Sequence, residues 1–111
     1  MSELEGIKKD SGKVRMELLS PIALKRTARV LTFGASKYAD HNWREGFKWS
    51  RLYGALFRHI FDHLMGIDKD DETGLSHLDH AACCIMFLQE HEELGLGEDD
   101  RYKGGSRNVK D

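Results

Sequence analysis

The sequence predicts an all-α protein folded as a small antiparallel bundle of three main helices. Three stretches carry apolar residues at helical spacing, and no stretch of any length alternates apolar with polar residues as a half-buried strand does. Short loops separate the three stretches, which favours antiparallel packing of chain neighbours. With 111 residues, of which 40% are apolar and 32% charged, the chain has the length and composition of one globular domain.

The first helix is predicted from residue 21 to about residue 39. Ser20 can cap its N-terminus, and Pro21 suits the first turn, where the helix needs no backbone N–H. An apolar stripe then recurs at spacings of three and four residues, formed by Leu24, Ala28, Leu31, Ala35 and Tyr38. A loop over residues 40–49, which contains both tryptophans, follows this helix.

Two further helices are predicted over about residues 51–65 and 77–94. Ser50 can cap the second helix, which ends near Gly66, and Ser76 with Asp79 fits a capping box at the start of the third. Residues 81–88 are apolar on every side, which is typical of a helix buried all round. Because a chain of this size builds only a modest core, we expect it to associate with copies of itself as a homo-oligomer.

Both ends of the chain are polar. We expect a flexible N-terminal segment over residues 1–12, a folded body over 13–94 and a flexible C-terminal tail over 95–111. The start of the chain lacks the basic and then apolar order of a signal peptide, and no stretch approaches the ~20 apolar residues of a membrane span. We therefore expect a cytoplasmic protein.

The net charge indicates which partners to expect, and the cysteines indicate the redox compartment. The formal net charge is −2, and the basic residues are spread along the chain, so we expect no duplex nucleic-acid partner. Cys83 and Cys84 are adjacent in an apolar helical segment, where they suit small core residues better than a disulfide. This usage fits a reducing compartment.

Four of the six histidines lie within residues 59–80. His59 and His63 are four residues apart and His77 and His80 three, so each pair projects from one face of its helix. Antiparallel helices joined by a short loop would bring the two pairs together. The histidines then either satisfy one another and nearby backbone, or form a shared polar or metal site. Asp62 is expected on the solvated edge of its helix.

An acidic linker separates the two histidine pairs. Its carboxylates, including Asp70 and Glu72, have two interpretations. They either favour the positive N-terminal end of the next helix and keep the loop solvated, or they bind a hard cation such as Mg²⁺ or Mn²⁺. Histidine nitrogen suits Mn²⁺ or Zn²⁺ better than Mg²⁺.

Several segments follow one another in an order that resembles a known family. They are Lys13-Val-Arg15-Met, Lys37-Tyr38-Ala-Asp40-His-Asn42-Trp43, Trp49-Ser50-Arg51-Leu-Tyr53-Gly-Ala, Arg58-His59 and Glu72-Thr-Gly74-Leu-Ser-His77-Leu-Asp-His80-Ala-Ala. Together, over about residues 13–90, they resemble the phage-associated family named as the N-terminal domain of dATP/dGTP diphosphohydrolases. The resemblance implies a small cytoplasmic enzyme of a virus or prophage that cleaves a purine deoxynucleoside triphosphate to monophosphate and pyrophosphate.

That family is similar to the all-α MazG-type NTP pyrophosphatases, which bind divalent metal through glutamates and aspartates on a helical bundle. This chain departs from the wider pattern. It has Arg58-His59-Ile-Phe-Asp62-His63 in place of a Glu-x-x-Glu pair, and His77-Leu-Asp-His80 in place of Glu-x-x-Asp. Histidines thus stand where the wider pattern has carboxylates.

Applied to this chain's own positions, the resemblance implies a site with three parts. Mn²⁺ or Mg²⁺ is expected on His59, Asp70, Glu72, His77 and His80, and a water attacking the α-phosphate is expected to be positioned by the catalytic groups His59, Glu72, His77 and His80. The triphosphate is expected to contact Lys13, Arg15, Lys37 and Arg58. Asn42 is expected to read an edge of the purine, and Trp43 either stacks on the base or fills the core.

Two alternatives use the same residues without catalysis. In the first, a viral protein captures a nucleotide in this pocket and sequesters it. In the second, the chain is a structural homo-oligomer whose histidines only hydrogen-bond one another.

Overall fold

The computed structural model describes residues 5–103 and contains three α-helices. These are α1 (Pro21–Lys37), α2 (Trp49–Leu64) and α3 (His77–Leu94), with short 3₁₀ turns at Met16–Leu18 and Asn42–Glu45. Within residues 5–103 the only β-type pairings are two isolated bridges. The predicted all-α class and the three main helices are confirmed.

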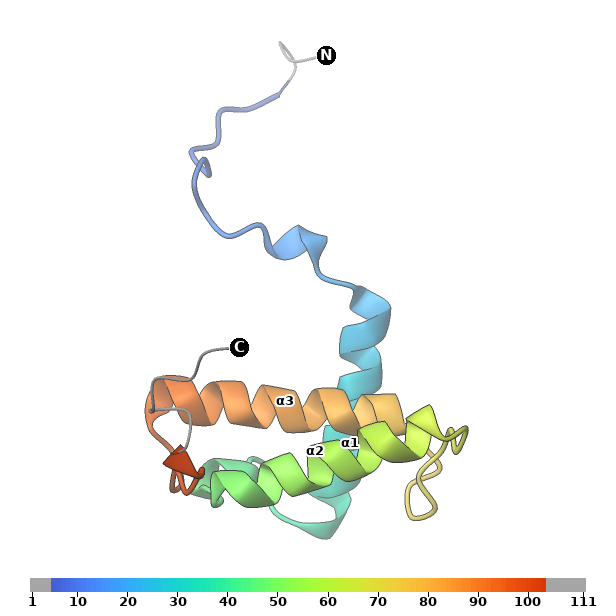
Figure 1. Ribbon diagram of the computed structural model, residues 1–111. Helices are drawn as coiled ribbons and strands as arrows, with labels where there is room; N and C mark the ends of the chain where they lie inside the picture. The colour runs from blue at the N-terminus through green and yellow to red at the C-terminus, as the bar shows by residue number, and fades with distance from the viewer. Residues whose placement is uncertain (1–4, 104–111) are drawn as a thin grey trace, which may run out of the picture.

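The helices form an antiparallel pair with a third helix across it. α2 and α3 lie side by side and run in opposite directions, while α1 crosses the pair and packs mainly against α3 (Figure 1). An ion pair fixes the crossing, because Arg26 Nε of α1 donates to Asp79 Oδ1 of α3 at 2.7 Å. Asp79 is only 8% exposed, so the paired guanidinium compensates for burying its charge.

The helix starts show which predicted caps form. Ser20 Oγ accepts from the Ala23 N–H, and Ser76 Oγ accepts from the Leu78 N–H, as capping requires. Asp79 does not complete a capping box, since it pairs with α1. Ser50 lies inside the first turn of α2 rather than before it, and its N–H and hydroxyl both donate to Asp100, whose carboxylate therefore sits at the positive end of this helix.

The core of the single chain is small. Its buried apolar side chains are contributed by α2, α3 and the loop between α1 and α2, namely Trp43, Trp49, Leu52, Leu56, Ala81, Cys83 and Cys84. Every side chain of α1, a helix that the structure describes in full, is at least partly exposed. Both cysteines are unpaired thiols, and burial raises the pKa of Cys83 to about 12 and that of Cys84 to about 11.

The segment after α3 returns to the start of α2. Trp49 Nε1 donates to the Leu96 carbonyl at 3.0 Å, and the Trp49 N–H donates to the Glu98 carbonyl at 3.0 Å. Gly97, with φ of +64°, lies so close to the Phe47 carbonyl that any side chain there would clash. The predicted C-terminal tail therefore begins as a hydrogen-bonded return segment, and its residues 104–111 lie outside the described residues.

The segment before α1 forms an extended arm. Residues 5–20, which we call the N-terminal arm, project away from the helical body (Figure 1). The helical body thus begins at Pro21, whereas we predicted a folded body from residue 13. The radius of gyration is 18.5 Å, compared with about 13 Å for a compact chain of this length.

Among the described residues, no helix is long and apolar enough to cross a membrane.

A buried histidine links α3 to the loop before α2. His91 is fully buried; its Nε2 accepts the Phe47 N–H at 3.2 Å, and its Nδ1 contacts the Phe87 carbonyl at 2.8 Å. Because a backbone N–H only donates and a carbonyl only accepts, these partners select the neutral ring with its proton on Nδ1. The ring also stacks with Trp43 and Phe47.

We predict that His91→Ala destabilises the fold by about 2–4 kcal/mol, because it leaves a cavity and removes both ring partners. Urea unfolding followed by circular dichroism measures this change. Glu93→Ala, at an exposed position of the same helix, is the control and should stay within about 0.5 kcal/mol of the wild type. A His91→Ala protein as stable as this control would show that the ring does not hold the loop.

Candidate functional site

Three of the clustered histidines meet where α2 and α3 approach the linker. His59 Nδ1 and His77 Nδ1 are 2.8 Å apart, and the His80 ring stacks on His59 with centroids 4.6 Å apart. His77 is 5% exposed, whereas His59 and His80 are partly buried. The helical spacing and the antiparallel pairing of α2 with α3 account for this meeting.

The linker between the helices brings a carboxylate to the histidines. Asp70 Oδ1 accepts the N–H groups of Glu72 and Thr73, both at 2.9 Å, which closes a tight turn. Thr73 Oγ1 in turn contacts His80 Nε2 at 2.7 Å. One ligand atom each from His59, Asp70 and His77 therefore lies within 4.8 Å of the other two, and we call these residues the histidine–aspartate triad.

The surroundings set the protonation of these groups. Burial lowers the pKa of His59, the neighbouring His80 and His77 rings add to the effect, and Asp70 only partly opposes it. Burial likewise lowers the pKa of His80. For Asp70, burial acts to raise the pKa, but the Thr73 N–H, His80 and the Glu72 N–H outweigh it, so the pKa lies below its usual value. Neutral imidazole and ionised carboxylate are the forms that bind metal.

The donor set of the triad fits a divalent transition metal. Two imidazole nitrogens and a carboxylate oxygen suit Mn²⁺ or Zn²⁺, whereas Mg²⁺ prefers oxygen ligands alone. The atoms converge from two helices and a loop held by backbone hydrogen bonds, so the arrangement is largely formed within one chain.

Two residues predicted as ligands have other partners. The Glu72 carboxylate accepts from Lys37 Nζ at 2.8 Å and is well exposed, and this ion pair raises the pKa of Lys37. His80 contacts Thr73 and stacks on His59, but it is not in the triad. Both residues adjoin the triad, and their roles as ligands stay predictions.

The structure adds residues that sequence reasoning left out. Asp62 keeps the exposed position expected of it, with its side chain 42% exposed, but its Oδ2 also lies 3.7 Å from His77 Nε2. Its position three residues after His59 was the available signal, because such residues share a helix face. Thr73 had no such signal. His63 lies outside the triad, with its Nε2 4.0 Å from Asp68 Oδ1.

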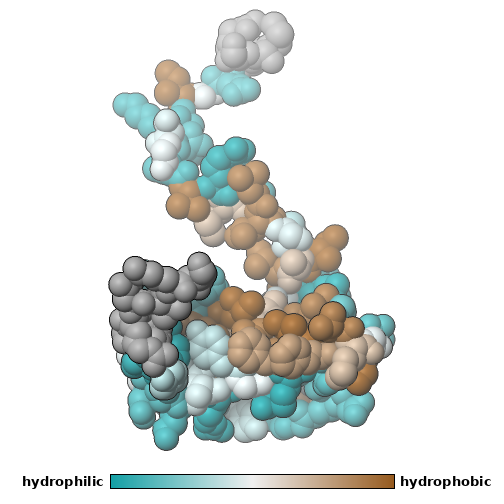
Figure 2. Space-filling view, in the orientation of Figure 1, coloured by the Kyte–Doolittle hydropathy of each residue, from teal (hydrophilic) through white to brown (hydrophobic). Residues whose placement is uncertain are grey.

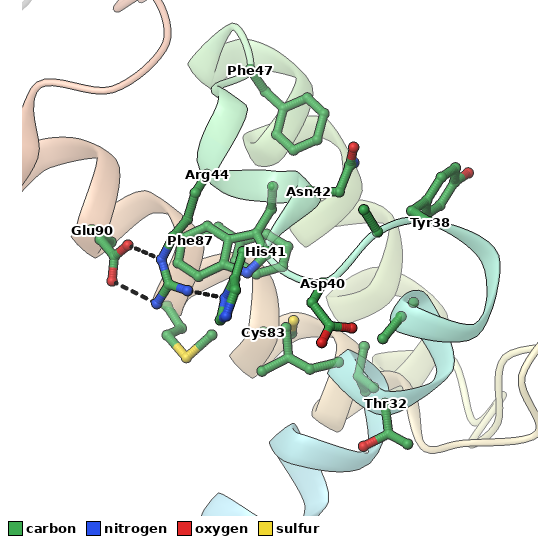
Figure 3. A pocket seen from close by; sticks show the side chains of 17 residues that line it. Thr32, Tyr38, Asp40, His41, Asn42, Arg44, Phe47, Cys83, Phe87 and Glu90 are labelled. Carbon is green, nitrogen blue, oxygen red and sulfur yellow. Dashed lines mark hydrogen bonds and ion pairs between the residues drawn. The ribbon is translucent and has the colours of Figure 1, made fainter.

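The predicted base-binding residues lie outside the histidine–aspartate triad. Asn42 and Trp43 line a cavity of about 540 Å³ between α1, the 40–47 loop and α3 (Figure 3). None of the described residues lining it is one of the four clustered histidines. The Trp43 ring has Phe87 stacked at 4.5 Å and the Arg44 guanidinium at 4.4 Å, and it is 9% exposed, so it fills the core in this structure. Arg44 also contacts Glu90 and His41, as Figure 3 shows.

The predicted phosphate ligands are dispersed. Arg58 directly precedes His59 and is exposed; its charge acts on His59, but its guanidinium turns back toward Gly54, one turn earlier in α2. Lys37 is held at the linker by Glu72. Lys13 and Arg15 lie on the N-terminal arm, where Arg15 pairs with Glu17 at 2.9 Å, and the arm points away from the chain's own body.

Comparison with known proteins gives two findings. The family model described as "dATP/dGTP diphosphohydrolase, N-terminal" matches residues 3–101. A protein of Salmonella phage PMBT28 named dATP/dGTP diphosphohydrolase is 44% identical over 85 residues, which are 77% of this chain and 29% of that relative. The chain thus spans less than a third of the relative's length. No solved structure matches it.

We predict that His59 titrates below its ordinary pKa of 6.5 in metal-free protein, because burial and the neighbouring rings disfavour its charged form. As pH falls through 6.5 the unfolded chain takes up this proton first, so the folded state loses stability below that pH. NMR of the ring Cε1–H signals, with His59→Gln to assign the peak, measures the midpoint. A midpoint at or above 6.5 would contradict the buried environment.

Proposed function

Because the chain belongs to the family of the dATP/dGTP diphosphohydrolase N-terminal domain, we propose that it hydrolyses a purine dNTP, dATP or dGTP, to dNMP and pyrophosphate at the histidine–aspartate triad. The observation that carries the proposal is the convergence of His59, Asp70 and His77 within 4.8 Å in a chain of this family. Such convergence of titratable groups is typical of a reaction centre.

His59, Asp70 and His77 would hold the divalent ion, with Mn²⁺ favoured over Mg²⁺ by the two nitrogen donors. When bound, the ion supplies Lewis acidity at a phosphoryl oxygen and lowers the pKa of a bound water. The chain supplies the positioning: Thr73 and Glu72 N–H groups orient Asp70, and His80 secures Thr73. Glu72 and His80 are further candidates for contact with the ion or the water.

Cations beside the triad would bind the triphosphate. Arg58 adjoins His59, and Lys37 is held by Glu72 at the linker, so both can neutralise charge that develops on the pyrophosphate leaving group. Asn42 would bind the base in the cavity beside α1, whereas the covered faces of Trp43 argue for a packing role. The cavity and the triad have no residue in common.

We predict that the purified protein converts dATP or dGTP to monophosphate and pyrophosphate with Mn²⁺, and that His77→Ala and Glu72→Ala each lower turnover at least about 100-fold. Chromatography of the products measures this. His63→Ala is the matched control, since His63 lies on α2 near the triad but outside it, and it should retain activity within about threefold.

Binding without product under Mg²⁺, Mn²⁺ or Co²⁺ would instead support a protein that sequesters nucleotide. Full activity in both His77→Ala and Glu72→Ala would remove the site assignment. Circular dichroism of each variant separates loss of chemistry from loss of fold.

We also predict that the triad binds Mn²⁺ more tightly than Mg²⁺ without nucleotide. Titration calorimetry and Mn²⁺ electron paramagnetic resonance measure both affinities. Asp70→Asn should weaken Mn²⁺ binding at least about 10-fold, because it removes the anionic ligand. The control Asp68→Asn changes an exposed carboxylate of the same linker and should leave the affinity within about twofold. Equal affinities for the two ions would contradict nitrogen ligation.

A further inference from the structure

The outer surface of α2 and α3 is an exposed apolar face. Its members are large apolar side chains that are 38–78% exposed, namely Phe57, Ile60, Phe61, Leu64, Leu78 and Ile85. Brown side chains gather over these two helices in the space-filling view (Figure 2). Neighbouring aromatic rings along α2 have their centroids 6.1 Å apart. No other described residue packs over their outer side, so the rings stay exposed. Large exposed apolar patches of this kind mark interaction sites in soluble proteins.

The N-terminal arm and the start of α1 form a second exposed apolar surface. Val14, Met16, Leu18, Leu19 and Ile22 are 48–84% exposed and lie away from the chain's own body. The arm is part of the family domain, because the family model matches from residue 3. One chain therefore contains two apolar surfaces that do not cover each other.

We propose that these two surfaces are the halves of one interface between two copies of this chain. The arm of each copy packs on the α2–α3 face of the other, so a two-fold axis relates two equal contacts. The two surfaces of each copy contain eleven large apolar side chains that are 38–84% exposed. At roughly 100 Å² for each, below the 150–250 Å² of a fully covered aromatic side chain, they would bury on the order of 1,000 Å² per copy. A stable interface needs about 800 Å² per partner.

The charges of the two surfaces match. Lys13 and Arg15 of the arm flank Val14, and the α2–α3 face leads through Met65 and Ile67 into the acidic linker. Exposed ion pairs with Glu17 and Lys37 already engage Arg15 and Glu72, so the match rests mainly on Lys13 and the other linker carboxylates. An arm lying along this face brings its cations to the linker of the other copy, beside that copy's triad. The phosphate-binding role of these cations rests on the proposed function, whereas the packing of the arm does not.

Sedimentation velocity tests the association. The wild type should be a dimer, and Phe61→Glu and Met16→Glu should each raise the dimer dissociation constant at least about 30-fold. Met16 lies outside the helical body, so its variant tests the interface even if Phe61→Glu misfolds. Leu94→Glu is the control, because Leu94 is 63% exposed on α3 but lies on the opposite side from Leu78 and Ile85; its dimer should be unchanged. A monomeric wild type overturns the proposal.

Photo-crosslinking tests which surfaces meet. Benzoylphenylalanine replaces Met16 in unlabelled chains, which are mixed and equilibrated with ¹⁵N-labelled wild type before illumination. Mass spectrometry should find mixed-isotope peptides that join the arm to residues 57–67 or 78–85. Crosslinks that join arm to arm, or that occur only within one isotopic chain, overturn the proposal even if a dimer forms.

Mixing variants tests the placement of the arm's cations. Lys13→Ala/Arg15→Ala chains and His77→Ala chains should each be nearly inactive alone, yet random pairing should restore about one quarter of wild-type activity, since half of the dimers gain one complete site. No recovery, with an active wild type, overturns the placement. An inactive wild type that still crosslinks through its arm would refute the proposed hydrolysis and leave the interface intact.

Discussion

The turn held by Asp70 is the constraint on which the rest of the structure depends. The chain must reverse between Leu64 and His77, and Asp70 makes this possible by accepting the N–H groups of Glu72 and Thr73 with one oxygen. The same turn sets the register of α2 against α3, and so it decides that His59 meets His77. The turn and the proposed site therefore share one carboxylate, and the hydrogen bonds that close the turn also lower the pKa of Asp70.

The second constraint is the size of the core. α2 and α3 bury only a few apolar side chains between them. No side chain of α1 is fully buried, and the ion pair of Arg26 with Asp79 joins α1 to α3. A core of this size leaves the outer surface of α2 and α3 exposed. The two uncovered apolar surfaces follow from the small core, and a second copy can cover both at once.

What the sequence could predict was local or followed from local features. Helical periodicity and the caps at Ser20 and Ser76 place the three helices, and the spacing of the histidines places His59 and His77 face to face. The pairing of Asp79 with Arg26 and of Glu72 with Lys37 was missed, because these partners are distant in the chain and periodicity carries no information about them. The arm was missed for the same reason, since an apolar segment in sequence looks alike whether it packs on its own chain or on another.

Histidine in place of carboxylate changes the charge of the proposed site. A triad of Asp70 with two neutral imidazoles would contribute one negative charge to a bound divalent ion, and the Asp62 carboxylate, 3.7 Å from His77, would be the next charge. A set of four carboxylates would instead repel a triphosphate unless further ions bound. The departure from the acidic pattern thus suits a centre with one ion, in which the cations need to act only at the far end of the triphosphate. Lys13 and Arg15 lie on an arm that a single chain directs away from its own helical body, so these cations favour a site completed by the arm of a second copy.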